Sequence, residues 1–236
     1  MFCHTAHIYD LIYEAAGKGY AAESSAIRSL IQARNPEART LLDVACGTRG
    51  HLRHLQHHYK VTGVDLDPNM LREARNHLPE IRLVEGDMRT LRIDIRFDAV
   101  ICLFSSIGCM SDTEELTSAI TAMASHLNPG GVLIVDGWVR PDAWRDGGST
   151  KVEVASSEGI KVARVVHSRR DGSATHLEMH HLVATQDGIQ HLVDYHDLTL
   201  FTPEEYEAAF QAADLVAETV DSPMQGRDRY IAVRAS

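Results

Sequence analysis

Five strand-like segments alternate with helix-like segments between residues 40 and 138, and this alternation is the feature that most restricts how the chain folds. The strand-like segments span residues 40–45, 61–67, 81–88, 97–108 and 132–138. Helical spacing of apolar residues follows in most of the intervening stretches, which is the pattern of βαβ units on a parallel sheet. The fourth segment, FDAVICLFSSIG, is almost continuously apolar, as expected of a strand buried on both faces. The sequence therefore predicts a doubly wound, mostly parallel α/β fold.

The pattern changes after residue 150, where short segments alternate polar and apolar residues with a period of two. These segments span residues 151–156, 160–168, 174–184 and 189–201. The breaks between them, SSEG, RRDG and TQDG, carry turn residues typical of β-hairpins. We therefore expect a small antiparallel sheet in this part of the chain. A threonine followed by acidic residues at 202–205 predicts the start of a further helix, and residues 228–235 predict a last strand.

Composition excludes several classes of protein. Acidic residues outnumber lysine and arginine by 33 to 23, for a formal net charge of −10, whereas a nucleic-acid binder needs a basic surface. No apolar run reaches the roughly 20 residues that span a bilayer, and the N-terminal stretch MFCHTAHIYD lacks the features of a secretory signal. Four cysteines without a CxxC pair indicate reduced thiols. We therefore expect a cytoplasmic protein with no membrane or nucleic-acid partner.

The stretch LLDVACGTRGHL, residues 41–52, joins the first strand to a turn of small residues. Ala45 and Gly47 allow the backbone to approach a ligand closely. The loop lacks the GxGxxG of dinucleotide-binding proteins and the GKS or GKT of phosphate-binding loops. It therefore favours a nucleoside cofactor without a pyrophosphate. Arg49 stands where such loops usually keep a glycine.

Three carboxylates follow successive strands at what we expect to be one edge of the sheet. Asp43 ends the first strand, Asp65 ends the second strand 22 residues later, and Asp87 ends the third. That spacing is about the one at which a carboxylate binds the hydroxyls of a ribose. The acids therefore favour S-adenosylmethionine, with Asp43 near its α-amino group, Asp65 on the ribose and Asp87 near the adenine amine. Met88 is expected to pack on the base.

Several motifs together carry a resemblance to a known family. They are DVACGT, GVDL, GDMR, FSSIG, LNPGG and a late TLF, and the likeness covers nearly the whole chain. In these motifs the chain resembles the bacterial amino-sugar N,N-dimethyltransferases, which act on nucleotide-linked deoxy sugars in antibiotic biosynthesis. The resemblance implies a seven-stranded class I methyltransferase sheet with a small antiparallel β insertion. It also implies S-adenosylmethionine as methyl donor, a dTDP-linked deoxy amino sugar as acceptor, and a homodimer.

The resemblance also implies a division of the chain into three parts. Residues 1–139 would hold the N-terminal helices and the cofactor-binding α/β core. Residues 140–200 would form the β insertion over the acceptor site. Residues 201–236 would supply a helix and a strand that complete the core.

The candidate site residues come from the strand ends and from this resemblance. The candidate cofactor-binding residues are Tyr20, Asp43, Ala45, Cys46, Gly47, Thr48, Asp65, Leu66, Met70, Asp87, Met88, Leu103, Phe104 and Ser105. The candidate catalytic residues are Tyr9, which matches the active-site tyrosine of the family, and Cys109, which follows FSSIG where the family often has histidine. The candidate substrate-binding residues are Tyr9, Ser106, Trp138, Arg140, His167, His180 and Arg227.

The candidates for the acceptor have separate reasons. Trp138 leaves the fifth strand at the edge where ligands bind. The two phosphates of a nucleotide sugar need cations, and the available ones are Arg140, Arg145, Arg164, Arg227 and Arg229. Arg227 is favoured because it matches an arginine of the family near the C-terminus. Either His167 or His180 was a candidate to face inward. No metal is expected, because the adjacent histidines at 180 and 181 point to opposite faces of a strand.

Departures from the family pattern leave alternatives open. Arg49 either crowds the sulfonium, pairs with the methionine carboxylate, or points to solvent from the first helical turn. Cys109 is a poor base at neutral pH, because an unperturbed thiol has a pKa of about 8.5. That weakness matters little for a neutral amine and more for a hydroxyl, so it favours N-methylation. The alternatives are a methyltransferase of the same fold for an aminonucleoside or a sugar hydroxyl, and a binding protein that has lost the chemistry.

Overall fold

The computed structural model describes residues 5–145, 152–222 and 224–235, and two β-sheets organise them. The helices are α1 (Ala6–Ala15), α2 (Tyr20–Arg34), α3 (Leu52–Leu55), α4 (Pro68–His77), α5 (Thr113–Ser125), α6 (Pro203–Ala212) and the short 3-10 helix η1 (Ser106–Cys109). The strands are β1 (Thr40–Val44), β2 (Lys60–Asp65), β3 (Arg82–Glu85), β4 (Phe97–Cys102), β5 (Leu127–Val139), β6 (Val152–Ser157), β7 (Ile160–Asp171), β8 (Ala174–Thr185), β9 (Gly188–Thr199), β10 (Ala217–Asp221) and β11 (Arg227–Val233). No helix within these ranges is both long enough and apolar enough to cross a bilayer.

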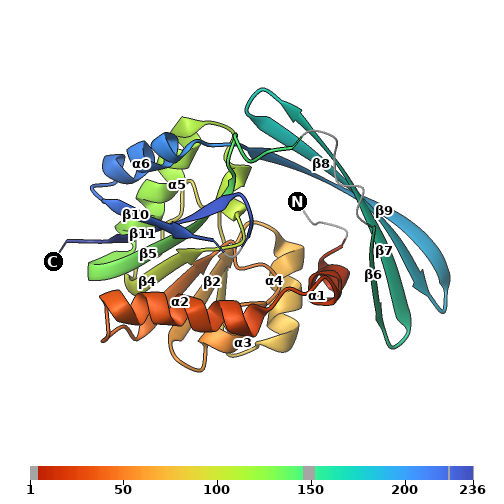
Figure 1. Cartoon of the computed structure of the whole chain (residues 1–236). Helices are drawn as coiled ribbons and strands as arrows, with labels where there is room; N and C mark the ends of the chain where they lie inside the picture. Colours follow the sequence, from red (N-terminus) through yellow and green to blue (C-terminus); the bar gives the residue numbers. More distant parts are fainter. Residues whose placement is uncertain (1–4, 146–151, 223, 236) are drawn as a thin grey trace.

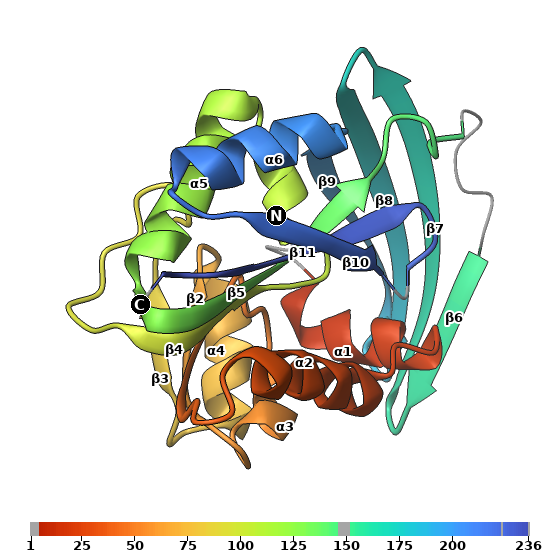
Figure 2. The same ribbon diagram turned by 60° about the vertical axis from the view of Figure 1, so that its left-hand side comes forward.

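The larger sheet has seven strands in the order β10-β11-β5-β4-β1-β2-β3. Strands β1 to β5 pair in parallel, whereas β11 pairs antiparallel to β5 and β10 antiparallel to β11. Helices α5 and α6 lie over one face of this sheet and α2 lies over the other (Figures 1 and 2). This arrangement confirms the doubly wound, mostly parallel α/β fold. The strand order reverses between β1 and β4, and ligands of such sheets bind beyond the carboxyl ends of the strands at that point.

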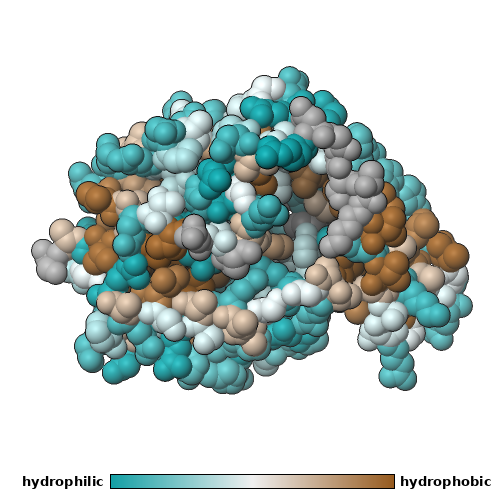
Figure 3. Space-filling model, in the orientation of Figure 1, coloured by the Kyte–Doolittle hydropathy of each residue, from teal (hydrophilic) through white to brown (hydrophobic). Residues whose placement is uncertain are grey.

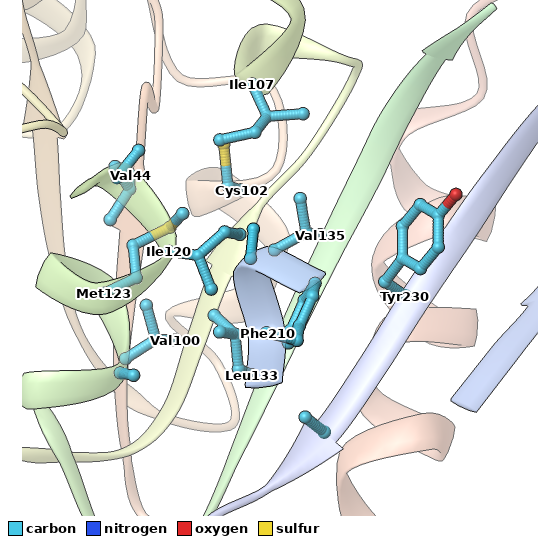
Figure 4. Close-up of a cluster of buried hydrophobic side chains, with 14 of the residues drawn as sticks. Val44, Val100, Cys102, Ile107, Ile120, Met123, Leu133, Val135, Phe210 and Tyr230 are labelled. Carbon is cyan, nitrogen blue, oxygen red and sulfur yellow. The ribbon is translucent and has the colours of Figure 1, made fainter. Parts of the chain in front are cut away.

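Apolar residues stand at both odd and even positions of the central strands, so apolar side chains point to both faces of the larger sheet. Val100 and Leu133 belong to the cluster packed beneath α5 and α6, which Figure 4 shows in close-up. Their chain neighbours Ile101 and Ile134 belong to the cluster packed beneath α2, α3 and α4. Each of the four side chains is fully buried, and burying such a side chain stabilises the fold by about 1.5–3 kcal/mol. The continuous apolar character predicted for these strands thus follows from burial on both faces.

The smaller sheet has four antiparallel strands in the order β6-β7-β8-β9, and it confirms the predicted antiparallel insertion. It stands apart from the larger sheet with α1 between the two, as Figure 1 shows. Ile8 and Ile12 of α1 pack on Ala155, Val162 and Val183 from the inner face of the smaller sheet. The helix therefore joins the two sheets, and its N-terminal half sits beside the carboxyl edge of the larger one.

The outer face of the smaller sheet carries several exposed apolar side chains. Val154, Ile189 and Tyr195 on this face are 69%, 75% and 66% exposed. Residues of this kind form a hydrophobic surface over the smaller sheet in the space-filling view (Figure 3). An exposed apolar surface of this sort is typical of an interaction face.

Local signals set several element boundaries, among them the helix start predicted at residues 202–205. Asp67 caps α4 by accepting a hydrogen bond from the Asn69 N–H, with Pro68 in the first turn. Thr202 and Glu205 form a capping box at the start of α6.

Several boundaries differ from the prediction, and β5, for example, begins at Leu127 rather than at residue 132. Strand β4 ends at Cys102, and the segment after it turns through Phe104 and Ser105, whose φ angles are 56° and 65°. The Phe104 N–H donates to Asp136 and the Ser105 hydroxyl donates to the Gly137 carbonyl, so contacts with β5 hold this turn. The apolar pattern extended that strand because Leu103, Phe104 and Ile107 continue the apolar run of β4. The run HLRHLQHHY was expected to be helical, but α-helix covers only Leu52–Leu55.

Candidate active site

Three cavities meet at the carboxyl edge of the larger sheet. The strand-end cavity lies beyond β1, β2 and β3, and its volume is about 240 Å³. The loop cavity lies against the β1–α3 loop and α2. The roofed cavity, of about 260 Å³, lies between this edge and the inner face of the smaller sheet. Tyr9 of α1 and Ser106 of η1 line all three, so they mark the point where the cavities join.

Asp65 and Asp87 line the strand-end cavity. The Asp65 carboxylate accepts hydrogen bonds from the Gly47 N–H at 2.8 Å and from the Asp67 N–H at 2.9 Å. These bonds fix both oxygens at the end of β2, and each oxygen keeps a second lone pair for a hydroxyl donor. The Asp87 carboxylate instead accepts from the Arg89 guanidinium, which holds the pKa of Asp87 below its usual value. Apolar walls from Leu66, Met70 and Met88 complete the cavity.

The loop cavity presents two buried polar atoms that have no hydrogen-bond partner within the described ranges. One is Oδ2 of Asp43, whose side chain is 2% exposed, and the other is the hydroxyl of Tyr20, which is 4% exposed. Burial, reinforced by the charge of Asp65, raises the pKa of Asp43 well above its usual value. Burial also raises the pKa of Tyr20, so its hydroxyl remains a donor. An amino acid head group, with one ammonium and one carboxylate, is the complement of this anionic acceptor and neutral donor.

These observations fit the expected S-adenosylmethionine. Unpartnered buried polar atoms are rare in folded proteins because each costs about 1–3 kcal/mol. The ammonium of the methionine end would satisfy Asp43, and its carboxylate would accept from Tyr20. The adenosyl end would occupy the strand-end cavity, with its ribose hydroxyls on Asp65.

Arg49 lines neither the strand-end cavity nor the loop cavity. Its Nε donates to Asp10 of α1 at 3.0 Å, and the neighbouring Thr48 hydroxyl donates to the other oxygen of Asp10 at 2.6 Å. The side chain therefore neither crowds a sulfonium nor pairs with the methionine carboxylate. Glycine is required at position 50 of this loop, because a Cβ there would lie 2.3 Å from Cε1 of Tyr20.

The roofed cavity contains two arginines in different electrostatic states. Arg164 of β7 forms an ion pair with Glu153 of β6, and its guanidinium lies 4.5 Å from the ring centroid of Tyr13. Arg227 of β11 stacks on the Trp138 ring at 4.3 Å. Its Nη1 donates to the Ser105 hydroxyl at 2.9 Å.

Arg227 has no ion-pair partner within the described ranges. Its Nε has no hydrogen-bond partner, and no carboxylate of the described segments forms an ion pair with it. Burial lowers its pKa, as expected of a desolvated cation. An anionic ligand group in the roofed cavity would pair with this side chain.

The junction between the strand-end and roofed cavities is lined by Tyr9, Ser106, Cys109 and His196. Burial raises the pKa of Cys109 and that of Tyr9, so the thiol and the phenol both stay protonated at neutral pH. Burial lowers the pKa of His196 to about 4, so its imidazole stays neutral. His196 was not among the sequence candidates.

The structure brings most of the sequence candidates to these cavities. The loop cavity collects Tyr20, Asp43, Cys46, Thr48 and Leu103, shares Ala45 and Gly47 with the strand-end cavity, and shares Phe104 with the roofed cavity. The strand-end cavity collects Asp65, Leu66, Met70, Asp87 and Met88. Ser105, expected on the cofactor side, lines only the roofed cavity, together with Trp138 and Arg227.

Three candidates lie outside the cavities. The Arg140 guanidinium donates to Asp228 at 2.7 Å and to Asp142 at 3.2 Å, so its charge is already neutralised. His167 and His180 lie on the outer face of the smaller sheet, because they have the opposite parity to the cavity residues Val166 and Met179. Successive residues of a strand point to opposite faces, so a one-residue difference moves a side chain out of the site.

The alternation of side chains along each strand could have identified the site residues that the sequence analysis missed. Glu153, Arg164, Val166, Leu177, Met179, His196 and Leu198 all line the roofed cavity from strands β6 to β9. Once one inward residue of the sheet is fixed, the pairing register fixes the others. Leu177 lies opposite His196 and Thr175 opposite Leu198, so these four share a face.

Comparisons with known proteins agree with this geometry. The family described as "Methyltransferase domain" matches residues 41–131. The dTDP-3-amino-3,4,6-trideoxy-alpha-D-glucopyranose N,N-dimethyltransferase of Streptomyces venezuelae is 45% identical over 232 residues, which cover 98% of each chain. The crystal structure of DesVI from Streptomyces venezuelae superposes with a TM-score of 0.92 at 45% identity and covers 98% of each chain. SAM-bound CalS10, an amino pentose methyltransferase from Micromonospora echinaspora, superposes with a TM-score of 0.87 at 39% identity and covers 97% of each chain.

Proposed function

The chain belongs to the family of S-adenosylmethionine-dependent amino-sugar N,N-dimethyltransferases, and from this premise we propose the reaction that its cavities carry out. The enzyme transfers methyl groups from S-adenosylmethionine to the amino group of a dTDP-linked deoxy amino sugar. Two methyl groups are added in succession, as the names of its relatives describe for their own substrates. The product belongs to antibiotic biosynthesis, the setting of the related CalS10.

The observation that supports this function is the placement of complementary groups in different cavities that join. Asp43 and Tyr20 lie at the loop end, where they suit the methionine head group. Arg227 lies at the roofed end, where it suits a phosphate of the nucleotide. A sugar held between them would carry its amine at the junction lined by Tyr9 and Cys109. This order of groups is the order of donor, reacting atoms and nucleotide in the proposed complex.

The chemistry asks little of the protein beyond positioning. A neutral amine is a good nucleophile, and its lone pair attacks the methyl carbon as the C–S bond breaks toward sulfur. Holding nitrogen, methyl carbon and sulfur in line supplies much of the acceleration in such transfers. The aromatic rings of Tyr13, Phe104 and Trp138 line the roofed cavity and would exclude water from the reacting groups.

The test is a comparison of matched acceptors. Purified enzyme with S-adenosylmethionine is assayed against a dTDP-linked deoxy amino sugar and against the same nucleotide sugar with a hydroxyl in place of the amine. We expect dimethylated product from the first and no product from the second, detected by mass spectrometry. Methylation of the hydroxyl compound alone would overturn the choice of nitrogen.

We further propose that the three predicted parts of the chain have separate functions. Residues 1–139 carry the cofactor cavities, residues 140–200 cover the acceptor, and residues 201–236 complete the core and supply Arg227. Residues 1–4, 146–151, 223 and 236 of these parts lie outside the described residues.

We also propose a cytoplasmic homodimer. The free thiols of Cys46, Cys102 and Cys109 support a reducing compartment. The apolar outer face of the smaller sheet supports pairing of two copies about a two-fold axis, since such an interface uses the same patch twice. Light scattering should give the mass of a dimer for the wild-type protein, and Ile189→Lys should shift it toward the monomer. A wild-type monomer at micromolar concentration would contradict the proposal.

A further inference from the structure

His196 occupies the junction between the donor and acceptor cavities. It lies on β9 and lines both the strand-end cavity and the roofed cavity, as Cys109 does from η1. Strand β9 and η1 approach closely, because a Cβ at Gly108 would lie 3.2 Å from Leu198 Cδ2. Leu198 and His196 share the inner face of the sheet. The close approach at Gly108 thus brings the His196 position next to the end of η1.

The polar groups at the junction differ in their ability to accept a hydrogen bond. The Cys109 thiol is a weak acceptor, and burial keeps it protonated by raising its pKa. The Ser106 hydroxyl donates to the Leu103 carbonyl at 3.2 Å, and its oxygen is a less basic acceptor than an imidazole nitrogen. A neutral imidazole nitrogen is the most basic acceptor among the neutral side chains at this junction. Burial lowers the pKa of His196 to about 4, and this keeps the ring neutral beside the positive sulfonium, where a second positive charge would be repelled.

We propose that His196 is a further catalytic residue, which accepts a hydrogen bond from an N–H of the acceptor amine and so turns the nitrogen lone pair toward the methyl group. This inference rests on the proposed function. As the N–C bond forms and the C–S bond breaks, the electron pair of the C–S bond goes to sulfur. The product ammonium keeps its extra proton until it reaches solvent, because an imidazole of such low basicity does not remove it.

The inference makes the second methylation the more sensitive step. A primary amine has two N–H groups that can bond to the surrounding side chains, whereas the monomethylated amine has one. Loss of the His196 acceptor therefore leaves the secondary amine with no fixed orientation. The variant should accumulate monomethylated product.

The experiment compares His196→Leu with His191→Leu, the same substitution on the outward face of the same strand. We expect His196→Leu to lower kcat for the amino sugar about 10-fold or more, the value of one lost hydrogen bond, and to release monomethylated sugar. Calorimetry with S-adenosylhomocysteine present should show weaker binding of the dTDP-amino sugar and unchanged binding of dTDP. His191→Leu should match the wild type in each measurement.

Two additional variants separate an acceptor from a merely structural residue. His196→Gln keeps a hydrogen-bond acceptor and should retain part of the activity. Cys109→His in the His196→Leu background returns an imidazole to the junction from η1 and should restore turnover and dimethylation.

Wild-type dimethylation by His196→Leu would overturn the inference. So would equal loss in His196→Leu and His196→Gln with no rescue by Cys109→His. A wild-type enzyme that does not methylate the amino sugar would instead overturn the proposed function, so the two failures are distinguishable.

Discussion

Replacing Asp43 by asparagine should stabilise the protein without cofactor and weaken cofactor binding at the same time. Asp43 is 2% exposed, and its Oδ2 has no hydrogen-bond partner among the described residues. The isolated protein therefore carries a buried carboxylate whose charge no described residue balances. Asparagine has nearly the same shape and no charge, so the substitution removes the cost without creating a cavity.

The two effects have opposite signs and comparable sizes. Relief of an unsatisfied buried group should raise the free energy of unfolding by about 2 kcal/mol, which corresponds to about 4–8 °C in Tm for a chain of this length. Loss of the pair between Asp43 and the ammonium of the cofactor should cost about 3 kcal/mol, or roughly 100-fold in Kd. Saturating S-adenosylmethionine should therefore cancel most of the thermal advantage of the variant.

The pH dependence gives a second measurement of the same charge. Burial raises the pKa of Asp43 in the folded state, so the folded protein binds more protons at this site than the unfolded chain. Stability from this group consequently falls as the pH rises above about 4, the unfolded pKa of aspartate. The difference in Tm between Asp43→Asn and the wild type should vanish near pH 4 and grow toward neutral pH.

The assay is thermal unfolding with and without S-adenosylmethionine, together with titration calorimetry. Asp98→Asn is the matched control, because the Asp98 carboxylate accepts from the Arg39 and Thr40 N–H groups and from Asn128, away from the cavities. Burial acts to raise the pKa of Asp98, but these bonds lower it overall, so the control should lose stability and keep its cofactor affinity. The reasoning is refuted if Asp43→Asn unfolds below the wild type without cofactor and binds S-adenosylmethionine as tightly.

Three further predictions concern other groups around the cavities. Tyr20→Phe should weaken S-adenosylmethionine binding about 10-fold in calorimetry, and unchanged affinity would show that the unpartnered hydroxyl does not meet the ligand. Arg49→Gly should raise the KM for S-adenosylmethionine only a few-fold, through the lost, partly exposed ion pair with Asp10; a large gain in affinity would mean that the arginine obstructs the site. Arg227→Met should raise the KM for the nucleotide sugar about 100-fold. Arg140→Met should change this KM less than 3-fold, because Asp142 and Asp228 already neutralise the charge of Arg140. Equal effects of the two substitutions in steady-state kinetics would refute the distinction.

Many residues of the strand-end and loop cavities could be predicted from the sequence, because each lies in or next to a short motif at the end of a strand. Asp43 and Asp65 end strands that the apolar pattern locates, and parallel strands bring their carboxyl ends to one edge of a sheet. The small residues of the β1–α3 loop are likewise recognisable from their order in the sequence. What the residue order could not give is the partner of Arg49, because Asp10 comes from a helix 39 residues earlier.

The acceptor end depended on contacts that the sequence does not encode locally. His180 and His181 are adjacent, and only the position of the smaller sheet decides that His181 is buried while His180 lies on the outer face. The same placement brings His196 to the junction, although no motif marks it.

The sequence by itself determined the fold class, the order of the elements and the acids that end the strands, since these follow from residue periodicity and from the geometry of parallel strands. The tertiary structure alone decided which faces of the hairpins meet the ligand and which arginine has no ion-pair partner among the described residues. Arg140 donates to Asp228, which lies 88 residues later in the sequence. Arg227 instead stacks on the Trp138 ring and donates to the Ser105 hydroxyl. Such pairings depend on how distant segments pack against each other, and the local pattern of residues does not specify that packing.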